Sequence, residues 1–128
     1  MTDSFFDAFT PDQVARITTA GTRLHLPAGW SPIRERTPAD KAYIILAGEV
    51  SVRRGGQEIA RLGPGEIMGE TAIVADTLRT ATLVALTPLE LIHFTTEAVR
   101  RLREELPAFK RALDEVVLAR RDIAHTDQ

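Results

Sequence analysis

The chain contains no cysteine among its 128 residues, which excludes disulfide bonds, thiol catalysis and cysteine-ligated metal sites. It also lacks an excess of positive charge, since 16 lysines and arginines stand against 18 aspartates and glutamates, for a formal net charge of −2. This balance gives no general attraction to nucleic acid or to anionic membranes.

Long apolar runs are missing as well, because no segment approaches the length of a membrane span. The first residues, Met1 to Ser4, have neither the positive flank nor the apolar run of a secretory signal. Hydrophobic residues make up 44% of the chain and charged residues 27%, as in ordinary globular domains. We expect a cytoplasmic protein with one domain over residues 1–128, large enough for one core but not for two.

The histidines are few and scattered. A metal-dependent enzyme on a β-roll, of the kind found in the cupin family, needs clustered histidines and a carboxylate. His25, His93 and His125 form no such cluster, and no spacing suggests a serine–histidine pair. We expect a protein that is not an enzyme and that has no metal or cofactor.

The first 21 residues predict a short helix. Thr10 can cap it, Pro11 suits its first position, and Gly21 ends it. Core anchoring is the preferred interpretation of the three phenylalanines before the cap, over a docking patch for a partner. These are Phe5, Phe6 and Phe9.

From Thr22 to Thr95 apolar residues alternate in short runs, with turn residues every eight to twelve positions. Gly55-Gly56 predicts a hairpin, and Trp30 to Arg34 predicts an edge strand because Pro32 has no N–H to donate. The pattern indicates a mainly β fold of the α+β class, an eight-stranded antiparallel β-roll or jelly roll.

Two helices are predicted after the strands, the first starting near Thr95 and the second at Pro107. The apolar stripe from Phe109 to Ile123 either packs on the roll or pairs with a second copy as a homodimer. Charges on both helices are balanced, so no DNA-reading face is expected. Arg120 or Arg121 could reach a ligand as a cation, but solvated charge is the expected role.

One stretch, Gly65 to Thr82, carries the chemistry. Gly69 suits a place where something lies close to the backbone, and a short helical turn from Glu70 to Ile73 would leave N–H groups for an anion. Arg79, nine residues after Glu70, can offer a fork of donors to that anion. A carboxylate would repel that anion, but it is a good acceptor for a neighbouring hydroxyl group. A ligand that carries an anion next to a hydroxyl is typically a sugar phosphate.

This stretch resembles the phosphate-binding cassette of cyclic-nucleotide-binding domains, the family of the catabolite activator protein and of protein kinase A regulatory subunits. The resemblance implies a stand-alone domain that binds cyclic AMP, or cyclic GMP, and regulates an effector. Glu70 would accept from the ribose 2′-hydroxyl, Arg79 would hold the cyclic phosphate, and Thr80 would lie beside the purine and leave the base open. The ligand-binding residues that it implies are Met68, Gly69, Glu70, Thr71, Ala72, Arg79, Thr80 and Ala81.

The resemblance extends over the roll, with one departure. Many members carry Glu-Gly-Asp where this chain has Glu35-Arg36-Thr37, and we expect that loop to lie away from the cassette. Within the single domain we expect an N-terminal helical segment at 1–21, the β-roll at 22–95, and hinge or lid helices at 96–125. The alternative is a degenerate roll that binds no nucleotide and serves as a protein-interaction module.

Overall fold

The computed structural model has helices at both ends of the chain and antiparallel strands between them. It describes residues 4–38, 40–70, 79 and 81–126, with side chains as far as Arg120. The short helix predicted from Glu70 to Ile73 therefore has all but its first residue outside the described residues. The elements are η1 (Phe5–Ala8), α1 (Pro11–Ala20), β1 (Thr22–Leu26), β2 (Lys41–Ala47), β3 (Val50–Arg54), β4 (Gln57–Leu62), β5 (Ile67–Met68), β6 (Thr82–Ala85), β7 (Leu89–Thr95), α3 (Thr96–Glu105) and α4 (Pro107–Thr126).

The strands form two antiparallel sheets, one of four strands in the order β1-β7-β2-β5 and one of three in the order β4-β3-β6. The described residues thus contain seven strands, not the eight predicted. The predicted edge strand Trp30 to Arg34 is reduced to a single bridge between Ile33 and Leu83. Pro32 explains the difference, because it cannot donate to a ladder.

The four-stranded sheet is buried on both faces, as the alternating side chains of β2 show. Ala42 and Ile44 belong to a cluster shared with the helices, whereas Tyr43 and Ile45 belong to a cluster between the two sheets. All four side chains are buried. Because alternate residues of a strand point to opposite faces, one strand ties the roll to the helices.

The predicted helix signals are confirmed. The Thr10 side chain accepts from the Gln13 N–H, with Pro11 in the first turn of α1, and the Thr95 side chain caps α3. Between the last two helices, α3 ends at Glu105 and Pro107 starts α4.

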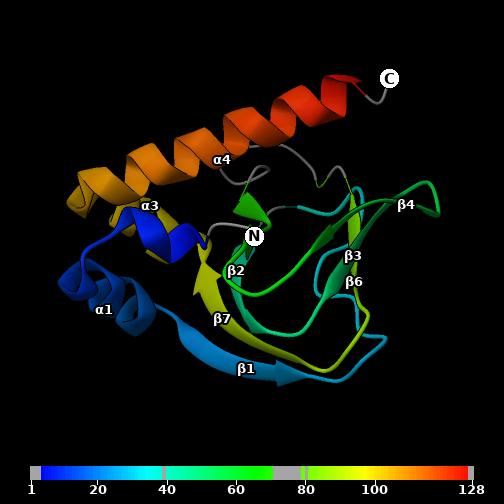
Figure 1. Cartoon of the computed structure of the whole chain (residues 1–128), viewed down its shortest axis with the longest axis horizontal. Helices are drawn as coiled ribbons and strands as arrows, with labels where there is room; N and C mark the ends of the chain where they lie inside the picture. Colours follow the sequence, from blue (N-terminus) through cyan, green and yellow to red (C-terminus); the bar gives the residue numbers. More distant parts are fainter. Residues whose placement is uncertain (1–3, 39, 71–78, 80, 127–128) are drawn as a thin grey trace.

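Helix α4 runs along one side of the molecule, from the end where α1 and α3 lie to the end of the β3-β4-β6 sheet (Figure 1). Its Phe109 ring packs on Phe5 and Phe9, with centroids 5.8 and 6.4 Å away. Ala112, Leu113 and Val117 are also buried, so this stripe packs on its own chain. In the described part of the chain, no helix is both long and apolar enough to cross a bilayer.

Candidate functional site

Arg79 is a buried arginine, 5% exposed, next to the end of β5. One terminal nitrogen of its guanidinium donates to the Gly69 carbonyl and the other to the Lys41 carbonyl. Burial lowers the pKa of Arg79, and the charges of Asp40 and Glu70 act in the opposite direction. Burying this cation away from water therefore costs free energy, and two backbone carbonyls orient it.

Gly69 is required by crowding at this point. Its φ is +86°, and a Cβ would lie 2.8 Å from the Ile33 side chain and 3.1 Å from both an Arg79 terminal nitrogen and the Lys41 carbonyl. The sequence expectation that something lies close to the Gly69 backbone is correct. The Ile33 side chain, the guanidinium and the Lys41 carbonyl all lie there, so a larger residue would displace Ile33 or Arg79.

Glu70 is 1% exposed, and its carboxylate accepts a hydrogen bond from Arg120 of α4. The Arg120 side chain is 28% exposed, so the expectation of a solvated charge is wrong. Spacing could have indicated this, because Leu113, Val117 and Arg120 fall on one face of a helix and the first two are buried. The side chain of Arg121 is outside the described residues.

The loop Glu35-Arg36-Thr37 lies against the cassette, so the expectation that it lies away is also wrong. The Arg36 N–H donates to the Arg79 carbonyl at 2.8 Å, and the Arg79 N–H donates to the Thr37 carbonyl at 2.9 Å. Arg36 has a φ of +64°, a left-handed conformation that favours the glycine many family members carry here. The turn is kept although the glycine is not.

The other predicted site residues divide into two groups. Met68 is fully buried in the cluster between the sheets, and Ala81 is buried just before β6. Thr71, Ala72 and Thr80 lie outside the described residues. The structure therefore brings Gly69, Glu70 and Arg79 together, and the roles assigned to the other members stay predictions.

Sequence reasoning did not single out Tyr43 and His93, whose rings are 5.5 Å apart on facing positions of β2 and β7. Burial and the Asp40 charge raise the pKa of Tyr43, while the charge of Arg79 lowers it. Burial and the Lys41 charge lower the pKa of His93, and Asp40 opposes them. The available signal was the alternation of side chains along the two strands that carry them, β2 and β7.

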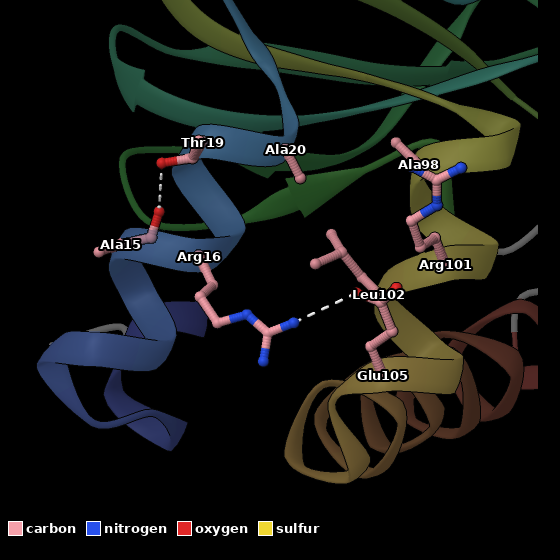
Figure 2. Close-up of a pocket in the computed structure, with 8 residues that line it drawn as sticks. All are labelled: Ala15, Arg16, Thr19, Ala20, Ala98, Arg101, Leu102 and Glu105. Atoms are coloured by element: carbon pink, nitrogen blue, oxygen red, sulfur yellow. Dashed lines mark hydrogen bonds and ion pairs between the residues drawn. The ribbon is translucent and has the colours of Figure 1, made fainter.

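A separate pocket of about 440 Å³ lies between α1 and α3 (Figure 2). Its sides include Ala15, Ala98 and Leu102, and Arg16 reaches across from α1 to Glu105 of α3 at 3.2 Å. None of the predicted site residues lines it. Over the residues whose placement is described, no three histidine or acidic side chains are grouped as metal ligands would be.

Comparison with known proteins gives the same family as the cassette. The model of the cyclic nucleotide-binding domain matches residues 23–105. The CRP-like cAMP-activated global transcriptional regulator of Mycobacterium tuberculosis is 28% identical over 121 residues, 91% of this chain and 54% of the regulator. The cGMP-dependent protein kinase egl-4 of Caenorhabditis briggsae is 29% identical over 89 residues, 70% of this chain and 12% of the kinase.

Among solved structures, the catabolite activator protein of Thermus thermophilus superposes with a TM-score of 0.85 at 26% identity, covering 96% of this chain and 60% of that one. The chain thus spans only part of the length of each of these three relatives. The family match includes Gly69, Glu70 and Arg79 and more than half of the chain. The chain belongs to the cyclic nucleotide-binding domain family.

Proposed function

We propose that this domain binds a cyclic nucleotide monophosphate at the cassette and acts as a ligand-sensing regulatory module. Cyclic AMP is the first candidate and cyclic GMP the second. The relative that matches over 91% of this chain is named for activation by cyclic AMP, and the one that matches over 70% is named for cyclic GMP. Thr80, which would lie beside the base, is compatible with both.

The observation that carries the proposal is the state of Arg79. In the part of the chain that the structure describes, no salt bridge includes this buried guanidinium, whose two recorded side-chain partners are neutral carbonyls. A buried cation is stabilised far more by an anion than by carbonyl dipoles. A phosphate with one negative charge would supply that anion. The Arg79 guanidinium is already held at the Gly69 carbonyl, next to Glu70.

Glu70 provides the second half of the recognition. A carboxylate can only accept, so it repels a phosphate and suits a hydroxyl donor such as the ribose 2′-hydroxyl. Its nearly complete burial would make that hydrogen bond stronger than one in water. Two opposite charges from one short segment would therefore fix both ends of the sugar phosphate.

Arg120 gives a route from ligand to output. Because it donates to Glu70 from α4, a 2′-hydroxyl that arrives at the same carboxylate must share it or displace Arg120. Either event changes how the last turns of α4 are held, while Phe109 holds its first turns. The regulatory step in this proposal is a shift of α4 between two positions whose populations depend on ligand.

The output surface is proposed to be α4 itself. Leu118 is 57% exposed on this helix, on the opposite side from Leu113. Pairing with a second copy or with an effector protein would cover it, and a shift of α4 would then be transmitted to the partner. We keep the homodimer and the effector as alternatives for this step.

The alternative function, a roll that binds no nucleotide and serves as a protein-interaction module, has one observation in its favour. Both charged groups of the cassette already have protein partners, since Arg79 donates to carbonyls and Glu70 accepts from Arg120. If those contacts are sufficient, no ligand is needed to stabilise the site.

Thermal melting distinguishes the two functions. We expect cyclic AMP at about a hundred times its dissociation constant to add about 2.7 kcal/mol, which raises the melting temperature by on the order of 10 °C at this size. Linear AMP and cyclic GMP in parallel report on the ring and the base. No shift with either cyclic nucleotide at about 1 mM would favour the interaction module.

A further inference from the structure

The main chain of Arg79 is held by a loop on another part of the chain. Its N–H donates to the Thr37 carbonyl and its carbonyl accepts from the Arg36 N–H, at 2.9 and 2.8 Å. Both backbone groups of Arg79 are thus bonded to neighbouring residues of one loop. The position of this loop therefore sets the position of the Arg79 main chain, from which the side chain extends.

The loop is in turn tied to the three-stranded sheet through Glu35. The Glu35 N–H donates to the Thr82 hydroxyl of β6 at 2.9 Å. The Glu35 carboxylate accepts from the Gly55 N–H, in the turn between β3 and β4, at 3.0 Å. Neither bond belongs to a strand ladder, so both depend on the side chains present in this sequence.

Arg36 lies between these anchors in a conformation that costs free energy. Among the described residues it is the one non-glycine residue with positive φ, at +64°. Such a residue keeps this conformation only where its surroundings impose it. Here the surroundings are the bonds of Glu35 on one side and of Arg79 on the other.

We propose that Glu35 and Thr82 are positioning residues for Arg79, and that they set the affinity of the cassette for phosphate through the strained loop at Arg36. This inference rests on the proposed function for its effect on affinity. Its structural part, that Glu35 fixes the Arg79 main chain, can be tested without any ligand.

The ligand-free test is hydrogen exchange of the Arg79 amide, which is bonded to Thr37. In Glu35→Ala we expect this amide to exchange about tenfold faster or more, because the loop has lost an anchor. Glu35→Gln keeps an acceptor for the Gly55 N–H and should exchange like the parent. Thr82→Val removes the hydroxyl at nearly constant size and should resemble Glu35→Ala. Glu104→Ala, on the exposed face of α3, is the control.

The ligand test is a double-mutant cycle with cyclic AMP. Loss of one hydrogen bond at Glu35 should weaken binding about 3- to 10-fold in the parent, with recovery in Glu35→Gln. In an Arg79→Ala background, which has no guanidinium to position, Glu35→Ala should change affinity less than twofold, since Glu35 acts through the Arg79 side chain. A penalty that is equal in both backgrounds overturns the proposal.

These experiments distinguish a failure of the positioning role from a failure of the proposed function. If the parent binds no cyclic nucleotide but the Arg79 amide exchanges faster in Glu35→Ala, the positioning role stands and the proposed function fails. If the parent binds while Glu35→Ala matches it in both exchange and affinity, the positioning role is wrong and the proposed function stands.

Discussion

Two arginine–glutamate pairs connect helices to distant parts of this molecule, and they differ in their surroundings. Arg16 and Glu105 join α1 to α3 across the pocket of Figure 2, with side chains 55% and 51% exposed. Arg120 and Glu70 join α4 to the cassette, with side chains 28% and 1% exposed. The same chemical pair is therefore held in water in one place and largely out of water in the other.

The difference shows where charge can carry function. An exposed pair gains little because water and salt screen it. A buried carboxylate cannot lose its partner without a new one, so it responds to any donor that competes for it. Glu70 meets that requirement and Glu105 does not, so we propose that ligand is sensed at the cassette rather than at the open pocket.

The largest effect should come from removing the cation of the cassette. Arg79→Ala is expected to weaken cyclic AMP binding by about 2–4 kcal/mol, or about 30- to 1000-fold, because a charge-assisted contact to phosphate is lost. Fluorescence competition measures it, with the exposed Arg61→Ala as control. An Arg79→Ala variant that binds as the parent does would remove Arg79 from the site.

The next largest effect tests recognition of the ribose by Glu70, as distinct from recognition of the phosphate by Arg79. Glu70→Gln should weaken cyclic AMP binding about tenfold, because the amide is a poorer acceptor for the ribose hydroxyl. For 2′-deoxy cyclic AMP, which lacks that hydroxyl, the same substitution should have almost no effect. Equal losses with both nucleotides would show that Glu70 does not recognise the ribose.

A direct contrast of the two pairs is a stability measurement. Arg120→Met leaves Glu70 buried without its partner and should lower the free energy of unfolding by about 1–2 kcal/mol, since the partial exposure of Arg120 reduces the usual cost. Arg16→Met should cost less than about 0.5 kcal/mol. Urea unfolding of both variants checks the comparison, which fails if the two losses are equal.

The smallest effect is a pH dependence at His93. Burial lowers the pKa of His93 in the folded state, so the unfolded chain takes up a proton first as the pH falls. Its contribution to stability is complete above the unfolded pKa of about 6.5 and is lost as the pH falls through the folded value. His93→Gln should make the melting temperature less dependent on pH in that window. An unchanged slope would show that His93 contributes nothing.

The sequence was sufficient for the features that depend on local chemistry. Thr10, Pro107 and the Gly55-Gly56 turn act within a few residues, so helix starts and a hairpin could be predicted from them. Gly69 was correctly assigned to a crowded position because only glycine tolerates it.

What the sequence did not provide depends on contacts between distant segments. The loop around Arg36 was expected to lie away from the cassette, but tertiary hydrogen bonds join it to Arg79 and accompany the glycine-like conformation of Arg36. Arg120 was interpreted as solvated because the position of Glu70 under α4 is fixed only by the packed helix. The eighth strand was overpredicted because one proline outweighs the alternation around it.

Whether the cassette binds a cyclic nucleotide can be measured by calorimetric titration of the unmodified chain with cyclic AMP. We expect a saturable heat with one nucleotide bound per chain, which is much reduced in Arg79→Ala. If a titration up to about 1 mM gives no heat with either cyclic AMP or cyclic GMP, the cassette does not bind a cyclic nucleotide.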